Sequence, residues 1–131
     1  MLQITRQSDY AIQLVNRLAK LEPRERLSLR PFSRESNISF LFLQKIARQL
    51  KQARIIEATL GPSGGYRLKK PAKSISLKDI VEAVEGACGI VDCLKAESVC
   101  NKMGNCQSRK VWKKVNTKIL KMLNDTLICS R

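Results

Sequence analysis

Four of the five cysteines of this chain lie in one short segment, residues 88–106. Cys93, Cys100 and Cys106 form the pattern C-x6-C-x5-C, and the residues between them are largely polar. Polar spacers that include glycine and asparagine predict a loop rather than a core element. Three thiolates on one loop can converge on a single point, and thiolate sulfur is a ligand for zinc and for iron–sulfur clusters. The pattern therefore predicts a metal centre here. Cys88 is a spare fourth ligand, although a small buried or turn residue is the favoured interpretation of Cys88.

The chemistry of the rest of the chain narrows the class of protein. An odd cysteine count suits a disulfide framework poorly, and the polar N-terminus has no signal-peptide core. We therefore expect a cytoplasmic protein with reduced thiols. The sequence contains no run of about 18 apolar residues, so we expect no membrane-spanning helix. Because the chain has no histidine to serve as a base for a cysteine nucleophile, we do not expect an enzyme.

The charge of the chain indicates an anionic partner. The 131 residues include 25 lysines and arginines against 11 acids, for a net charge of +14. Such a balance is typical of proteins that bind nucleic acid or an anionic membrane surface. Residues 1–70 carry a net charge of +9 and residues 71–131 a net charge of +5, so charge alone does not locate the binding site.

The elements that must position these groups begin with three helices. Apolar residues at steps of three and four predict a first helix over residues 5–21. Asp9 lies near its positive end, where a carboxylate offsets the helix dipole. A second short helix is expected at about residues 30–36. Ser39 then caps a third helix, from residue 40 to about residue 53.

The third helix carries a stripe of basic residues at every third position. These residues are Lys45, Arg48, Lys51 and Arg54. No acid interrupts the chain between Glu35 and Glu57. A short helix, a tight turn and a basic helix predict a helix-turn-helix that enters the major groove of DNA. The alternative for such a stripe is a solvated helix face.

Two short β-strands are expected after the third helix, at residues 54–60 and 66–69. Between them the sequence Gly-Pro-Ser-Gly-Gly is a dense turn signal. A hairpin directly after a basic helix predicts a winged helix-turn-helix. The glycines allow the backbone to approach a phosphate closely, and Arg67, Lys69 and Lys70 supply positive charge.

The C-terminal part of the chain predicts self-association. A helical segment over residues 74–86, with a capping box of Ser76 and Asp79 at its start and Gly86 at its end, closes the first domain. A long helix from residue 107 to about residue 128 carries an apolar stripe. A small domain cannot bury so wide a face, which favours a homodimer. The expected fold is mainly α with a small β-hairpin. A winged helix-turn-helix domain (1–86) is followed by a cysteine-rich loop (87–106) and a dimerisation helix with its tail (107–131).

These features together resemble the IscR/NsrR-type transcription regulators of bacteria, the Rrf-two family. Four stretches carry the resemblance in the order of the family: residues 4–11 (Ile-Thr-Arg-Gln-Ser-Asp-Tyr-Ala), residues 38–46, the wing sequence Gly-Pro-Ser-Gly-Gly-Tyr and the triple cysteine. The resemblance implies a homodimeric regulator that binds a double-stranded DNA operator. It also implies an iron–sulfur cluster, 4Fe–4S or 2Fe–2S, in the loop between the winged domain and the long helix.

The resemblance also implies which residues contact DNA. By position, the DNA-facing residues of the recognition helix and the wing are Ser39, Leu41, Phe42, Gln44, Lys45, Arg48, Gly64, Gly65 and Arg67. Leu60 stands where relatives often have a minor-groove arginine. Leu41 replaces a position that is commonly polar and contacts bases, so we expect a different operator.

The fourth ligand of the metal is where this chain departs most from the family. Relatives often have a histidine three residues after the third cysteine, but here that residue is Arg109, and a guanidinium is not an iron ligand. Other relatives use an aspartate of the first helix, donated by the partner subunit, and Asp9 matches it. The ligands implied by the resemblance are Cys93, Cys100, Cys106 and Asp9. Zinc is the alternative metal, held by the three thiolates with Asp9 or Cys88, and a cluster-free thiol regulator also stays open.

Overall fold

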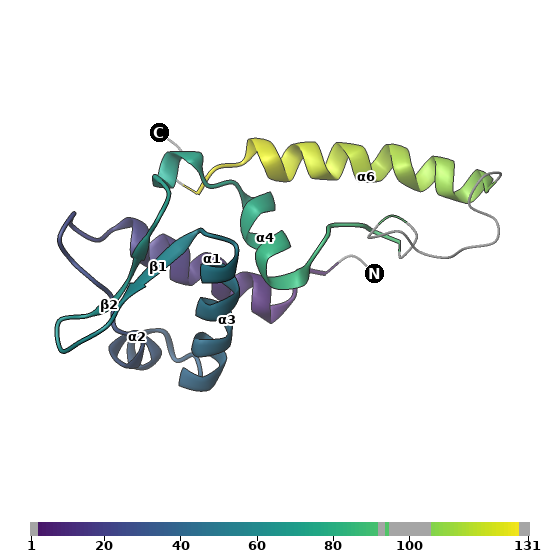
Figure 1. Ribbon diagram of the computed structural model, residues 1–131. Helices are drawn as coiled ribbons and strands as arrows, with labels where there is room; N and C mark the ends of the chain where they lie inside the picture. The colour runs from purple at the N-terminus through teal and green to yellow at the C-terminus, as the bar shows by residue number, and fades with distance from the viewer. Residues whose placement is uncertain (1–2, 92–93, 95–105, 129–131) are drawn as a thin grey trace.

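The computed structural model describes residues 3–91, 94 and 106–128 (Figure 1). The elements along the chain are α1 (Arg6–Ala19), α2 (Leu29–Ser36), α3 (Phe40–Gln52), β1 (Ile56–Thr59), β2 (Gly65–Leu68), the 3-10 helix η1 (Ala72–Ser74), α4 (Leu77–Glu85) and α6 (Gln107–Asp125). The fold is thus mainly helical with a two-stranded antiparallel hairpin and a long C-terminal helix. This architecture confirms the expected fold class.

Helices α1, α3 and α4 pack around one core together with β1. Four residues of α3 face inward and are fully buried, and these are Leu43, Ile46, Ala47 and Leu50. Leu14 of α1 and Ile80 of α4 belong to the same core. Burying one such side chain contributes about 1.5–3 kcal/mol. The core therefore fixes one face of α3 firmly and leaves the opposite face available for other contacts.

The start of α1 is tied to the end of α4. Thr5 caps α1, because its side chain accepts a hydrogen bond from the Ser8 N–H at 3.2 Å. The hydroxyls of Thr5 and Ser8 both donate to Oε1 of Glu85, with 3.1 Å between Ser8 Oγ and that oxygen. Since Ser8 is buried, the carboxylate satisfies a hydroxyl whose isolation would be costly. The serine of the Ser-Asp-Tyr-Ala stretch therefore has a structural role.

The hairpin of β1 and β2 forms the predicted wing directly after α3. The segment before α2 pairs with it, because the backbone N–H groups of Leu27 and Tyr66 each donate to the other's carbonyl at 2.9 Å. The turn at the tip is closed by a 3.0 Å hydrogen bond from the Gly64 N–H to the Gly61 carbonyl. The wing is therefore a two-stranded antiparallel sheet, and the segment that leads into α2 pairs with its second strand, β2.

Helix α4 begins with the predicted capping box. Ser76 Oγ accepts from the Asp79 N–H at 3.1 Å, and the Asp79 carboxylate accepts from the Ser76 N–H at 3.0 Å. The helix stops at Gly86, whose φ of +85° suits a residue without a Cβ. These local signals explain why the sequence alone located both ends of this helix.

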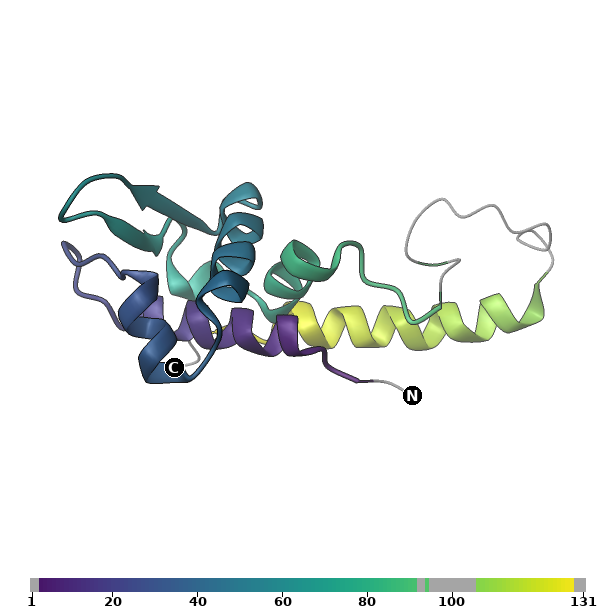
Figure 2. The same cartoon turned by 90° about the horizontal axis from the view of Figure 1, so that it is seen from below.

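Helix α6 extends away from the other elements and is attached to them by its C-terminal end (Figures 1 and 2). Two backbone hydrogen bonds make this attachment, from Ile128 N–H to the Ile75 carbonyl at 3.0 Å and from Leu77 N–H to the Thr126 carbonyl at 2.9 Å. This pairing ends the helix at Asp125, slightly before the predicted end near residue 128. The 19 residues make α6 about 28 Å long. Within the described ranges, none of the helices has the length and apolarity to cross a membrane.

Candidate nucleic-acid interface and cysteine site

The solvent-facing side of α3 brings together most of the residues predicted to contact DNA. Ser39, Leu41, Gln44, Lys45 and Arg48 are exposed, because the other side of the helix is buried in the core. Ser39 occupies the cap position of the helix, as predicted, but its hydroxyl makes no capping hydrogen bond. The hydroxyl is therefore free to bind a partner. Contact of these residues with DNA stays a prediction.

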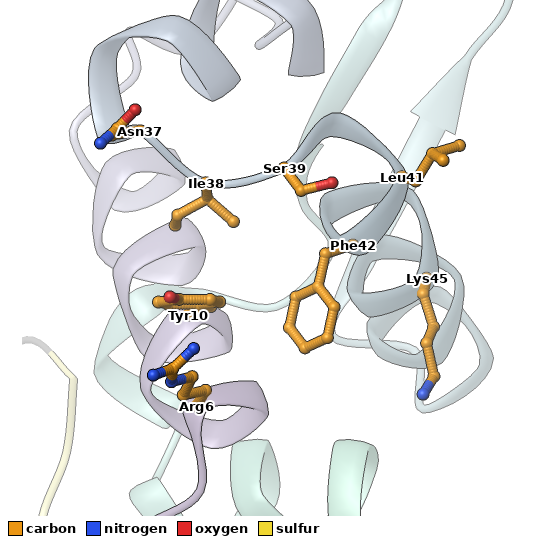
Figure 3. A pocket seen from close by; sticks show the side chains of 8 residues that line it. All are labelled: Arg6, Tyr10, Asn37, Ile38, Ser39, Leu41, Phe42 and Lys45. Atoms are coloured by element: carbon orange, nitrogen blue, oxygen red, sulfur yellow. The ribbon is translucent and has the colours of Figure 1, made fainter.

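Phe42 differs from its neighbours because its ring turns back toward α1. It meets the ring of Tyr10 edge to face, with 5.5 Å between the ring centroids and an angle of 87° between the planes (Figure 3). This geometry is favourable for aromatic pairs. Phe42 is half-buried as a result, and it supports the start of α3 rather than standing clear of it.

A shallow hollow of about 440 Å³ lies between the starts of α1 and α3 (Figure 3). Its lining residues are Arg6, Tyr10, Asn37, Ile38, Ser39, Leu41, Phe42 and Lys45. The two aromatic rings supply apolar surface, while Arg6 and Lys45 supply positive charge. Sequence reasoning missed Arg6 and Tyr10 as part of this surface, because the packing of α1 against α3 brings them to it. It also missed Asn37, the C-cap residue of α2 in the turn that leads into α3.

The two wing glycines are required by close backbone packing. A Cβ on Gly64 would overlap the carbonyl oxygen of Thr59, and a Cβ on Gly65 would lie 2.7 Å from the carbonyl oxygen of Leu27. Gly65 also has a φ of +153°. Their presence in the sequence therefore has a structural reason that is independent of any phosphate contact.

The charges on the wing are partly neutralised within the hairpin. Arg67 forms an ion pair with Glu57, which lies directly opposite it on β1. A DNA contact by Arg67 would have to compete with this pair. Leu60, at the tip, is 95% exposed and has no charge to offer a minor groove. Arg26, which the sequence did not single out, lies beside the wing and donates from Nε to Thr59 Oγ1 at 3.4 Å.

Cys106 is the one member of the triple cysteine that can be placed, since Cys93 and Cys100 lie outside the described residues. It is the N-cap of α6, and its Sγ accepts a hydrogen bond from the Arg109 N–H at 3.5 Å. The side chain is half-buried. Cys106 therefore stands at the end of α6 that is farthest from the wing (Figure 1).

Asp9 lies in the first turn of α1, and its side chain is exposed. Its Oδ2 accepts a hydrogen bond from Gln13 Nε2 at 3.0 Å. Within one subunit α1 and the start of α6 are well separated in both views (Figures 1 and 2). Among residues 3–91, 94 and 106–128, no group of three cysteine or acidic side chains is close enough to hold a metal. One chain thus does not bring Asp9 to Cys106.

Cys88 lies at the exit of α4, in a different setting. It lines a cavity of about 260 Å³ between the chain after α4 and the middle of α6. Burial raises the pKa of the Cys88 thiol, and Glu82 raises it further, while Lys78 acts in the opposite direction. Nearby, the buried Asn116 of α6 accepts a hydrogen bond from the Ile90 N–H at 3.1 Å through Oδ1. This bond fixes the start of the cysteine-bearing segment against α6.

Comparison with known proteins finds similar sequences and structures along nearly the whole chain. Residues 4–129 match the model of the Rrf2 family, described as an iron-dependent transcriptional regulator. The chain is 35% identical to the HTH-type transcriptional regulator IscR of Cereibacter sphaeroides over 105 residues, covering 72% of this chain and 68% of that protein. Among solved structures it is similar to CymR, the global cysteine regulator of B. subtilis, with a TM-score of 0.78, 23% identity and coverage of 98% of this chain and 94% of that one. It is also similar to the oxidized form of Staphylococcus aureus CymR, with a TM-score of 0.72, 28% identity and coverage of 97% and 93%.

Proposed function

The chain belongs to the Rrf2 family of DNA-binding transcription regulators, and we propose that it works as a homodimer whose operator binding is controlled by an iron–sulfur cluster. One observation carries this proposal. Cys106 caps the free end of α6, while the other end of α6 is hydrogen-bonded to the winged part of the chain. Binding or loss of a cluster at the cysteines would therefore act on α6, which is directly attached to the winged helix-turn-helix domain.

The homodimer is supported by the apolar side chains that α6 exposes. Val111 is 59% exposed, Trp112 44% and Met122 65%, and Asn116 is the one buried residue of the helix. Covering such a face with its own copy removes apolar surface from water, which stabilises the dimer. It also places two recognition helices in one particle, as a two-part operator requires.

The ligands that we propose are the thiolates of Cys93, Cys100 and Cys106 and the carboxylate of Asp9 of the partner subunit. The donor chemistry fits a cluster, since such clusters take cysteine thiolates and accept a different fourth ligand. Asp9 is exposed, and its one hydrogen bond is to a side chain of its own helix, so it is accessible to a second subunit. Bound there, a cluster would supply a link that oxidants, nitric oxide or iron shortage can break.

The path from the cysteines to DNA runs through packed helices. Helix α6 packs on α4, and α4 packs on both α1 and α3. Gln7 of α1 donates from Nε2 to Gln49 Oε1 of α3 at 2.9 Å and to the Val84 carbonyl of α4, which binds these three helices to one another. A ligand that fixes α6 of one subunit to α1 of the other thus sets the separation of the two recognition helices. A coupling of about 1–3 kcal/mol would change operator affinity by about 5- to 150-fold.

Anaerobic purification tests the cluster. We expect brown protein, with visible absorption that air or nitric oxide bleaches. The fourth ligand is tested by Asp9→Ala, with Asp125→Ala as a matched exposed aspartate on α6. Loss or faster bleaching of the absorption in Asp9→Ala alone supports the assignment. A cluster that survives Asp9→Ala and is lost in Cys88→Ala would make Cys88 the fourth ligand instead.

A cluster-free regulator is the second candidate, because CymR, described as a global cysteine regulator and also solved in an oxidized form, has the same fold. In that case the thiols themselves respond to oxidation, or they hold zinc. Colourless anaerobic protein with stoichiometric zinc would favour the zinc form. Unchanged regulation after replacement of Cys93, Cys100 and Cys106 by serine would remove the cysteines from the mechanism altogether.

A further inference from the structure

We propose that Leu41 recognises the C5-methyl group of a thymine in the major groove and thereby specifies one base of the operator. The inference rests on the DNA binding of the family and on α3 as the recognition helix. It adds the chemical identity of the contacted group, which follows from how three consecutive apolar residues are arranged at the start of α3.

Phe40, Leu41 and Phe42 are consecutive, and among the described residues the outer two pack against the core while Leu41 does not. The guanidinium of Arg30 lies over the Phe40 ring, with its Cζ 4.3 Å from the ring centroid. The Phe42 ring meets Tyr10 edge to face. Leu41 is 74% exposed, and its side chain points away from the rings of Phe42 and Tyr10 (Figure 3).

The position of Leu41 matches the place where a recognition helix meets bases. It is the second residue of α3, and N-terminal residues of the recognition helix contact base edges in this class of domain. Exposed cationic side chains flank it, among them Lys45 one turn further along α3 and Arg6 across the hollow. Such side chains suit the phosphates on either side of a groove.

The chemistry of the side chain selects the base. Leucine has no hydrogen-bond donor or acceptor, so it cannot distinguish bases by their polar edges. The methyl group of thymine is the apolar feature that the major groove presents. Burying one methyl-sized group against leucine corresponds to about a fourfold gain in affinity. Leu41 therefore favours thymine over any base that lacks the methyl.

Deoxyuridine offers a direct test, because it pairs as thymine does and lacks only the C5-methyl. Full-length protein, purified anaerobically, first selects its preferred sequences from a random duplex library. Each thymine of the selected sequence is then replaced singly by deoxyuridine, and affinity is measured by fluorescence anisotropy. The protein variants are Leu41→Ala, the conservative Leu41→Met, and Leu60→Ala as a control leucine that is exposed on the wing.

For the wild type, we expect one replaced thymine in each half of the site to weaken binding about fourfold. Leu41→Ala should bind thymine and deoxyuridine at that position almost equally, whereas Leu41→Met and Leu60→Ala should keep the preference. The inference is overturned if no replacement weakens wild-type binding, or if Leu41→Ala keeps the full preference. If the library yields no preferred sequence, sequence-specific DNA binding itself fails, which is a separate and larger result.

Discussion

Replacing Gly64 with alanine should damage the wing and leave the core intact. The new Cβ would overlap the carbonyl oxygen of Thr59 and lie 2.9 Å from the carbonyl carbon of Leu60, and all of these atoms are backbone. Neither the backbone of Gly64 nor that of Thr59 can move easily. Gly64 is held by its hydrogen bond to Gly61, and Thr59 pairs with Gly65 in the hairpin. Forcing extra volume into such a contact costs about 1–3 kcal/mol.

The assay is urea unfolding followed by circular dichroism, with Ser63→Ala as the control in the same turn. Ser63 is exposed, so its replacement should change the free energy of unfolding by less than about 0.5 kcal/mol. Gly64→Ala should lower that free energy by about 1–3 kcal/mol with an unchanged m-value. Its affinity for operator DNA should also fall, because the wing no longer holds its shape.

A Gly64→Ala variant as stable as Ser63→Ala would refute this reasoning. It would mean that the tip of the hairpin relaxes freely and that the close backbone approach is not a constraint. If such a stable variant nevertheless lost DNA affinity, Gly64 would instead be needed for close approach to a phosphate, which is the role that the sequence suggested.

Three further predictions concern other parts of the chain. Arg48→Ala should weaken DNA binding for all sequences and reduce the slope of log affinity against log salt by about one, if its guanidinium touches a phosphate; an unchanged slope would remove it from the interface. Asn116→Ala, which removes the acceptor of the Ile90 N–H, should lower the free energy of unfolding by about 1 kcal/mol, whereas the exposed Asn124→Ala on the same helix should not. Because burial and Glu82 raise the pKa of Cys88 above its usual 9.0, the folded state holds this proton more tightly than the unfolded state; the free energy of unfolding should therefore fall as the pH rises above about 9, and this part of the fall should be absent in Cys88→Ala.

The helices and the wing could be predicted because their signals are local. Apolar spacing located α1 and α3, the Ser76–Asp79 capping box located α4, and Gly-Pro-Ser-Gly-Gly located the turn. The features that were missed depend on residues distant in sequence. The pairing of residues 126–128 with residues 75–77 joins two chain segments with no local signal in either.

The limits of prediction at the site have the same origin. The exposed face of α3 followed from its buried face, so Lys45 and Arg48 were located correctly on the surface. The hollow beside Tyr10 exists because α1 packs against α3, which a pattern along one helix does not contain. The Arg67–Glu57 pair could have been found, since the two residues are equidistant from the centre of the turn.

The arrangement of α6 restricts how a signal at the cysteines can reach DNA. Gln7, Gln49 and the Val84 carbonyl join α1, α3 and α4 through hydrogen bonds, and the same helices share a close-packed core. Such a core resists small internal shifts, because moving α3 against it would open cavities or force overlaps. A displacement of α6 should therefore move α1, α3, α4 and the wing together as one rigid body. Within our proposal, regulation then acts on the distance between two recognition helices, and the contacts that each helix makes with its own half-site stay the same.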